Sequence, residues 1–133
     1  MPTTYADFID ALEALAITGV VKTFQGPPAS LDTADLPARW VQMPKGKEPL
    51  LTFQTAGGWP TLTADLVVAI GPNAQDTQAA NFAAQVTMLD AVAAALRGAD
   101  LTKAKHTWEI RAGGVKVAGV AYWAVIATVT GKG

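Results

Sequence analysis

The sequence predicts an α+β fold in which two helices cover one face of a mostly antiparallel, twisted sheet, in the order α-β-β-β-β-α-β-β. Two segments space their apolar residues three and four apart, as an amphipathic helix requires, and several others alternate apolar with polar residues, as strands do. Clusters of glycine and proline separate these segments. The length of 133 residues falls within the range of one domain, so we expect a single domain over residues 1–133.

The first helix is predicted over residues 4–18. Thr4 is placed to cap it, and Asp7 lies near the positive end of the helix dipole. Gly19 can adopt the left-handed conformation that ends a helix, and the branched and aromatic residues 20–24 then predict a short strand. The apolar residues that recur at helical spacing are Tyr5, Phe8, Ile9, Leu12, Leu15 and Ala16.

A proline-rich loop over residues 25–37 is predicted to connect this strand to the next one. Residues 38–43 predict a strand that ends at Pro44, because proline lacks the amide N–H that a sheet uses. After a polar turn, residues 50–55 and 62–70 predict the two arms of a long β-hairpin.

The second helix is predicted over residues 76–97 and ends at Gly98. Residues 105–111 alternate as a half-buried strand does, and Ala112-Gly113-Gly114 is predicted to turn the chain into a last strand over residues 115–130. That strand is apolar on both faces, so we expect it to lie centrally or beneath a neighbouring subunit. The face of the second helix that we expect to be buried comprises Phe82, Val86, Leu89, Val92, Ala93 and Leu96.

The composition argues against several classes of function. Half of the residues are hydrophobic and only 16% are charged, against about 25% in a typical domain, so part of the apolar surface is expected to contact a partner. A net charge of -1 disfavours nucleic-acid binding, which requires clustered positive charge. Cysteine is absent, which excludes disulfides and thiolate sites. The longest late charge-free run, residues 117–131, is 15 residues long, below the roughly 18 that predict a membrane span, so we expect no membrane partner.

No motif predicts catalysis, a cofactor or a metal ion, and we expect the chain not to be an enzyme. The single histidine, His106, shares its strand face with Trp108 and Ile110, so a partly buried structural role is favoured over a catalytic one. Asp32 and Asp35 could form a paired carboxylate or a cation site. Aspartates in a loop more often make turns and caps, and we favour that interpretation.

Two features are candidates for contact with a partner protein. Lys45 and Lys47 form a compact basic pair, which is either solvated or faces an acidic partner. Trp59 lies at the predicted hairpin tip beside two glycines and has no evident core to enter, so exposure and an interface role are equally open.

The proline-rich loop carries a motif that resembles one protein family. An aromatic residue, a Gly-x-Pro element and an acidic stretch leading into a strand occur in order as Phe24, Gly26, Pro28, Asp32, Ala34, Asp35, Leu36, Pro37 and Ala38. This pattern resembles the tail terminators of long-tailed, lambda-like phages, in which an aromatic residue stands at the position of Leu36. The resemblance covers the whole chain in outline and residues 24–38 in detail. The second helix is more apolar than in that family, and the second half of the chain is less acidic.

The resemblance implies a structural virion protein at the neck end of the tail, made in the cytoplasm of the host bacterium. Such a protein closes into a ring, hexameric in this family, on the tail tube, ends tube growth and forms the joint to the head. Its partners are copies of itself, the tail tube protein and a head-side connector, and it needs no cofactor. A hairpin within residues 50–70 that reaches across the neighbouring copy would supply main-chain pairing in the ring. The residues proposed to contact a ring neighbour or the tube are Asp32, Asp35, Leu36, Lys45, Lys47 and Trp59.

Three alternatives stay open at this point. Another neck component, such as a head-tail connector or a tail-completion subunit, has a similar size and fold. A small α+β ligand-binding module or enzyme, with an apolar pocket behind the curved sheet, would explain the aromatic residues and His106. A host adaptor that dimerises through its last strand is the third.

Overall fold

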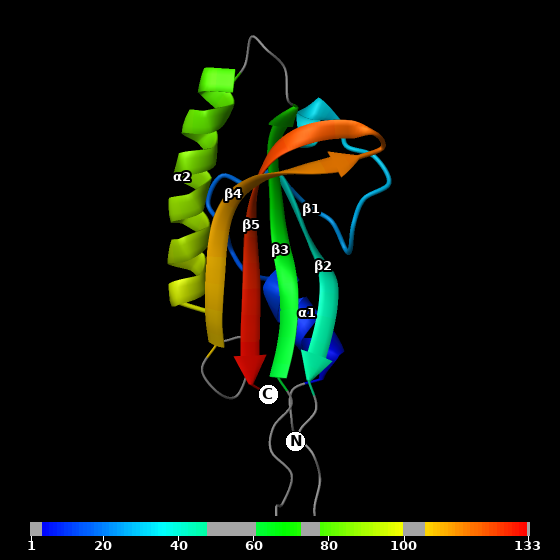
Figure 1. Ribbon diagram of the computed structural model, residues 1–133, viewed down its shortest axis with the longest axis vertical. Helices are drawn as coiled ribbons and strands as arrows, with labels where there is room; N and C mark the ends of the chain where they lie inside the picture. The colour runs from blue at the N-terminus through cyan, green and yellow to red at the C-terminus, as the bar shows by residue number, and fades with distance from the viewer. Residues whose placement is uncertain (1–3, 48–60, 73–77, 100–105, 133) are drawn as a thin grey trace, which may run out of the picture.

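The computed structural model describes residues 4–47, 61–72, 78–99 and 106–132 (Figure 1). The strands form one five-stranded sheet in the order β1-β2-β3-β5-β4. In chain order the elements are α1 (Tyr5–Glu13), β1 (Lys22–Thr23), a 3₁₀ turn (Thr33–Asp35), β2 (Ala38–Lys47), β3 (Thr61–Pro72), α2 (Gln78–Arg97), β4 (His106–Val117) and β5 (Val120–Lys132).

This arrangement confirms the predicted α+β class. β2, β3, β5 and β4 pair with their neighbours antiparallel, whereas β1 is parallel to β2, so the sheet is mixed. β5 lies between β3 and β4, which is the central position expected from its two apolar faces. The strand predicted over residues 50–55 lies outside the described residues.

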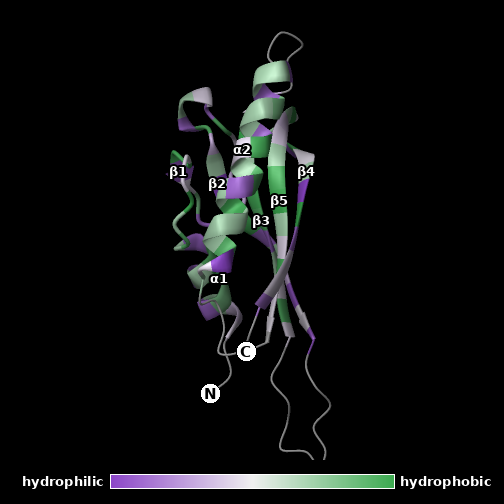
Figure 2. Ribbon diagram, turned by 90° about the vertical axis from the view of Figure 1, so that its left-hand side faces the viewer, coloured by the Kyte–Doolittle hydropathy of each residue, from purple (hydrophilic) through white to green (hydrophobic). Residues whose placement is uncertain are grey.

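Both helices cover the same face of the sheet (Figure 2). α1 packs on β2 and β3, and α2 packs on β3, β5 and β4. Each large aliphatic side chain buried between these layers contributes about 1.5–3 kcal/mol. The core between the two layers comprises Phe8, Leu12, Val41, Leu62, Ala64, Leu66, Val68, Ile70, Met88, Val92, Leu96, Val125, Ala127 and Val129.

The opposite face of the sheet is apolar at one end and polar at the other. At the polar end, Thr128 donates a hydrogen bond to Asp65 at 2.8 Å, and Thr63 and Thr130 are hydrogen-bonded at 3.2 Å. At the apolar end, the loop between β1 and β2 packs on the sheet through Phe24, Leu31 and Leu36. The loop therefore acts as a partial third layer. The sheet residues of this second core are Trp40, Val67, Ala69, Val117, Tyr122, Ala124 and Ile126.

The last hairpin turns later than the sequence predicted. Ala112-Gly113-Gly114 does not turn but continues β4, and the chain reverses at Ala118 and Gly119. Their φ angles of 52° and 80° are the two positive values that a tight two-residue hairpin requires. The glycine pair was a misleading signal, because glycine also permits the strong bend that β4 and β5 make at this end of the sheet (Figure 1).

β2 and α1 also end at different residues from those predicted. β2 runs through Pro44 to Lys47, because the register shifts between Gln42 and Lys45 and Met43 adopts a φ of 54°. The bulge lies beyond Ala38 and Arg39, the two β2 residues that pair with β1, so it accommodates a residue without an amide N–H. α1 begins as predicted, since the Thr4 hydroxyl accepts the amide of Asp7 at 3.1 Å, but it ends at Glu13 rather than residue 18.

Arg39 accounts for the early end of α1. Its guanidinium is buried beneath the helix and donates to the main-chain carbonyls of Glu13 and Leu15, and its Nε donates to the Thr23 hydroxyl at 3.1 Å. Carbonyls at a helix C-terminus lack partners within the helix and attract positive charge. Burial lowers the pKa of Arg39, and the carboxylate of Glu13 partly opposes this shift. An arginine stays protonated at neutral pH even so.

Gly71 makes a close contact where the first turn of α2 meets β3. A methyl group at this position would lie 2.6 Å from Asn81 Oδ1, and Asn81 Nδ2 donates to the Pro72 carbonyl at 3.0 Å. We therefore expect Gly71→Ala to lower the free energy of unfolding by about 1–2 kcal/mol, measured by urea denaturation. Gly113→Ala is the matched control, because its methyl would make an ordinary contact of 3.6 Å with Ile126. Equal urea midpoints of unfolding for the two variants would contradict this prediction, because they would show that the Asn81 side chain moves aside without loss of stability.

Candidate interaction surfaces

One flank of α2 is exposed, apolar and free of charge. The sequence from Gln78 to Leu89 contains no charged residue, and the ribbon of these turns is mostly green in Figure 2. Phe82 and Val86 lie one turn apart and are 58% and 44% exposed. A helix on a free surface normally presents charged residues on its outward side. This flank of α2 therefore has the composition of a contact surface.

The sequence predicted part of this surface as core, and that prediction was wrong. Phe82 and Val86 were expected to be buried, whereas the buried residues of α2 include Gln85 and Met88 beside the correctly predicted Val92 and Leu96. Alanines surround the helix, so the spacing of apolar residues fits more than one face. Gln85 is buried because its carboxamide bonds to strand carbonyls.

By length and composition alone, α2 would also pass as a membrane span. A core helix of a globular domain passes the same test. Met88, Val92 and Leu96 of α2 are part of the core, so packing on the sheet accounts for its apolar character on that side.

Exposed apolar residues also lie along the opposite edge of the sheet, spread over the length of β2. Met43 on β2 is 69% exposed, Tyr5 on α1 is 42% exposed, and Val21 precedes β1 with its side chain in solvent. The Tyr5 ring reaches across the end of β2, where it lies against Gly46. Apart from Val120 at the turn between β4 and β5, the exposed large apolar residues of the described ranges thus lie on two unlike flanks: the α2 flank (Phe82 and Val86) and the β2 flank (Tyr5, Val21 and Met43).

The loop residues of the motif have structural roles. Asp32 Oδ1 accepts the amide of Ala34 at 3.2 Å and caps the 3₁₀ turn, which confirms the turn interpretation. Asp35 lies 3.6 Å from the ammonium of Lys22 in a half-exposed ion pair, a contact of small energy. Leu36 packs on the outer core of the sheet. The motif therefore fixes the loop over the sheet, while Asp32 itself stays exposed.

The other predicted contact residues lie elsewhere. Lys45 and Lys47 are exposed near the end of β2, paired in register with Thr63 and Thr61. Within the described ranges, neither lysine has an acidic partner. Trp59 lies outside the described residues. The structure thus brings Asp32, Asp35 and Leu36 together in one loop and leaves the two lysines at the far end of the sheet.

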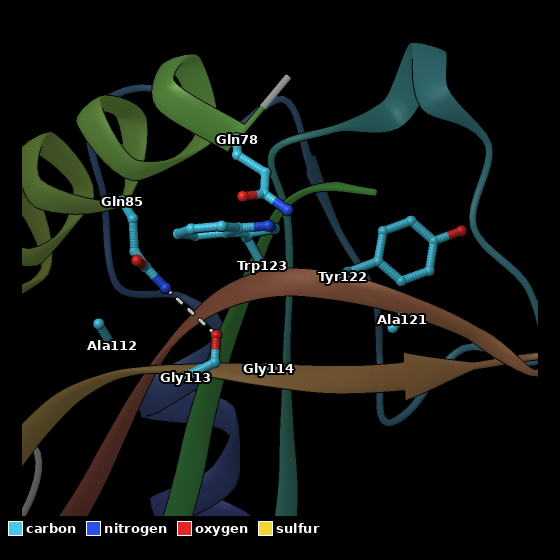
Figure 3. A pocket seen from close by; sticks show the side chains of 8 residues that line it. All are labelled: Gln78, Gln85, Ala112, Gly113, Gly114, Ala121, Tyr122 and Trp123. Carbon is cyan, nitrogen blue, oxygen red and sulfur yellow. Dashed lines mark hydrogen bonds between the residues drawn. The ribbon is translucent and has the colours of Figure 1, made fainter. Parts of the chain in front are cut away.

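An open groove of about 470 Å³ separates the start of α2 from the bent part of the last hairpin (Figure 3). Gln78 and Gln85 descend from α2 on either side of the Trp123 indole. Gln85 Nε2 donates to the carbonyls of Gly113 at 3.2 Å and Ala124 at 2.7 Å, which ties α2 to both strands. The groove is lined by these two glutamines together with small and aromatic residues of β4 and β5.

His106 has the structural role that the sequence favoured. Its Nε2 lies 2.9 Å from the Leu96 carbonyl near the end of α2, and its ring packs on Trp108 with a centroid distance of 5.4 Å. This contact fixes the end of α2 to the start of β4. Among the described residues, no three His, Asp or Glu side chains come together in an arrangement that would hold a metal ion.

No protein-family model matches the chain, and no curated protein sequence matches it.

Proposed function

We propose that this chain is a structural subunit of a phage tail, a tail terminator. In this proposal, copies of the chain close into a ring, hexameric as the resemblance implies, on the last layer of the tail tube. The ring ends tube growth and presents a surface to a head-side connector. The subunit functions by binding to copies of itself and to the tube, with no chemical step, cofactor or membrane contact.

The observation that carries the proposal is the pair of unlike apolar flanks. The α2 flank lies on the β4 and β5 side of the sheet, and the β2 flank lies on the opposite side. A head-to-tail contact between identical subunits joins two different surfaces of the chain and closes into a ring when the rotation allows. Two apolar surfaces on opposite edges fit that type of contact.

The loop motif supports the proposal in a different way. The residues that resemble the terminator family build the layer over the outer face of the sheet, through the Asp32 cap and the packing of Phe24 and Leu36. A shared motif with a structural role favours a shared scaffold. The motif leaves the choice of contact residues to the flanks, and the α2 flank lies on the helix that is more apolar than in the family.

Electron microscopy of particles from a phage that lacks this gene tests the proposal. A terminator halts polymerisation of the tube, so its loss is expected to give tails longer than those of the parental phage. Headless tails of normal length would contradict the proposal and favour a head-side connector. Particles of unchanged form would contradict both functions.

A further inference from the structure

β4 presents an open strand edge that the fold does not protect. It lies at the margin of the sheet, and in the described part of the chain only β5 pairs with it. Its twelve residues contain no proline, and their register with β5 has no irregularity. At the other margin, β1 and the bulge at Met43 and Pro44 blunt the edge of β2. Proteins usually blunt long edges because unpaired main-chain groups recruit another strand.

The main-chain groups of Ile110 point to this open edge. Val117 and Val120 flank the two-residue turn and pair directly, so the odd-numbered residues of β4 bond to β5 and the even-numbered ones face outward. A hollow of about 410 Å³ lies at the same place, lined by Glu109, Ile110, Arg111 and Thr128. The middle of the edge is therefore unpaired, and the face of the sheet beside it is hollowed.

The side chains of β4 are complementary to themselves about Ile110. Glu109 and Arg111 are exposed on one face of the strand, about 7 Å apart, and within the described residues neither has a charged partner. Bulky residues precede Ile110 and small ones follow it at matching distances: His106, Thr107 and Trp108 on one side, and Ala112, Gly113 and Gly114 on the other.

We propose that β4 pairs antiparallel with β4 of a second copy of this chain, about a two-fold axis at Ile110. In this register Ile110 exchanges both main-chain hydrogen bonds with its symmetry mate. Glu109 of each copy faces Arg111 of the other, so two ion pairs form. Trp108 faces Ala112, and Thr107 faces Gly113, so each bulky side chain meets a small one. Figure 2, seen from the side on which α2 and β4 lie, shows α2 in front of the sheet and β4 at the right-hand margin of the sheet.

The β4 pairing does not depend on the proposed tail function. It gives the free chain a dimeric state in addition to the ring. A ring with two unlike end faces has cyclic symmetry, so its neighbours meet head to tail and a two-fold contact has no place in it. The β4 pair therefore belongs to the free chain, where it covers an edge next to the α2 flank. Binding to a tube end would have to open this pair before a ring closes.

Substitutions that reverse the charges of Glu109 and Arg111 test the pairing in the purified chain, without tubes. Sedimentation equilibrium at low salt is expected to show a reversible monomer–dimer equilibrium for the natural chain. Glu109→Arg and Arg111→Glu each place two like-charge pairs in the contact and are expected to weaken dimerisation about tenfold or more. The double variant with both substitutions restores the ion pairs in reverse and is expected to dimerise again. An equimolar mixture of the two single variants is expected to form the mixed dimer.

A cysteine experiment tests the register independently, because the natural chain has no cysteine. Residue 109 of one copy and residue 111 of the other would form a non-hydrogen-bonded pair, in which the Cα atoms are about 4.5 Å apart. This separation suits a disulfide. Mild oxidation of mixed Glu109→Cys and Arg111→Cys chains is expected to give the mixed disulfide dimer, and each variant alone is expected to give little. Both sites are exposed, so circular dichroism is expected to show unchanged folding. A natural chain that stays monomeric, single charge variants that dimerise normally, or larger head-to-tail oligomers would each overturn the proposal.

Discussion

Replacing Arg39 by methionine is expected to lower the free energy of unfolding by about 3 kcal/mol. The side chain is only 4% exposed, and its guanidinium is shared by two carbonyls at the end of α1 and by Thr23 of β1. Methionine fills a similar volume but leaves those carbonyls without a donor. α1 would then lose its main polar attachment to the sheet.

Thermal unfolding followed by circular dichroism measures this effect, with an expected fall in the melting temperature of roughly 10 °C. Arg97→Met is the matched control, because Arg97 is exposed at the end of α2 and is expected to contribute less than about 1 kcal/mol. Arg39→Lys is expected to fall between the two, since an ammonium cannot reproduce the planar fork of donors. Equal stability of the Arg39→Met and Arg97→Met chains would contradict this role for Arg39.

The double variant Phe82→Glu with Val86→Lys is expected to abolish ring formation on tail tubes while the chain stays folded. Both positions are exposed in the single chain, and a Glu–Lys pair four residues apart supports the helix. The cost to folding should be less than about 1 kcal/mol. Burial of two charged groups in an apolar contact between subunits is far more costly than that. Association is therefore the property that should fail.

Binding to isolated tubes, measured by co-sedimentation, reads out this effect. Ala84→Glu is the control on the same helix, because Ala84 is also exposed but lies about 200° around the helix from Phe82. It adds a charge to the other side of α2 and is expected to leave ring formation intact. If the double variant formed normal rings, the claim that the α2 flank contacts a neighbouring subunit would be wrong.

The sequence predicted the class of fold because its periodicities were clear where one side of an element is buried. The alternation in β3 and the Thr4 cap placed that strand and the start of α1 close to where they are observed. The predicted ends of α1 and β2 were wrong because tertiary contacts decide them. α1 ends where Arg39 binds main-chain carbonyls, and β2 continues past Pro44 by means of a bulge.

The functional surfaces were harder to predict than the fold. An alanine-rich helix has no single apolar face, so Phe82 and Val86 were assigned to the core although they are exposed. The motif drew attention to Asp32, Asp35 and Leu36, which prove to organise the loop. One signal for the α2 flank was present in the sequence: a run from Gln78 to Leu89 without any charge.

Sedimentation velocity of the purified chain, alone and with isolated tail tubes, tests most directly whether this protein works by association. Alone, the chain is expected to sediment as monomer and dimer in equilibrium, because each apolar flank is small. With tubes, it is expected to move with them, in a fixed number of copies per tube end, as contacts with the tube add to contacts between neighbours. A dimer or monomer whose sedimentation is unchanged by tubes would contradict the account.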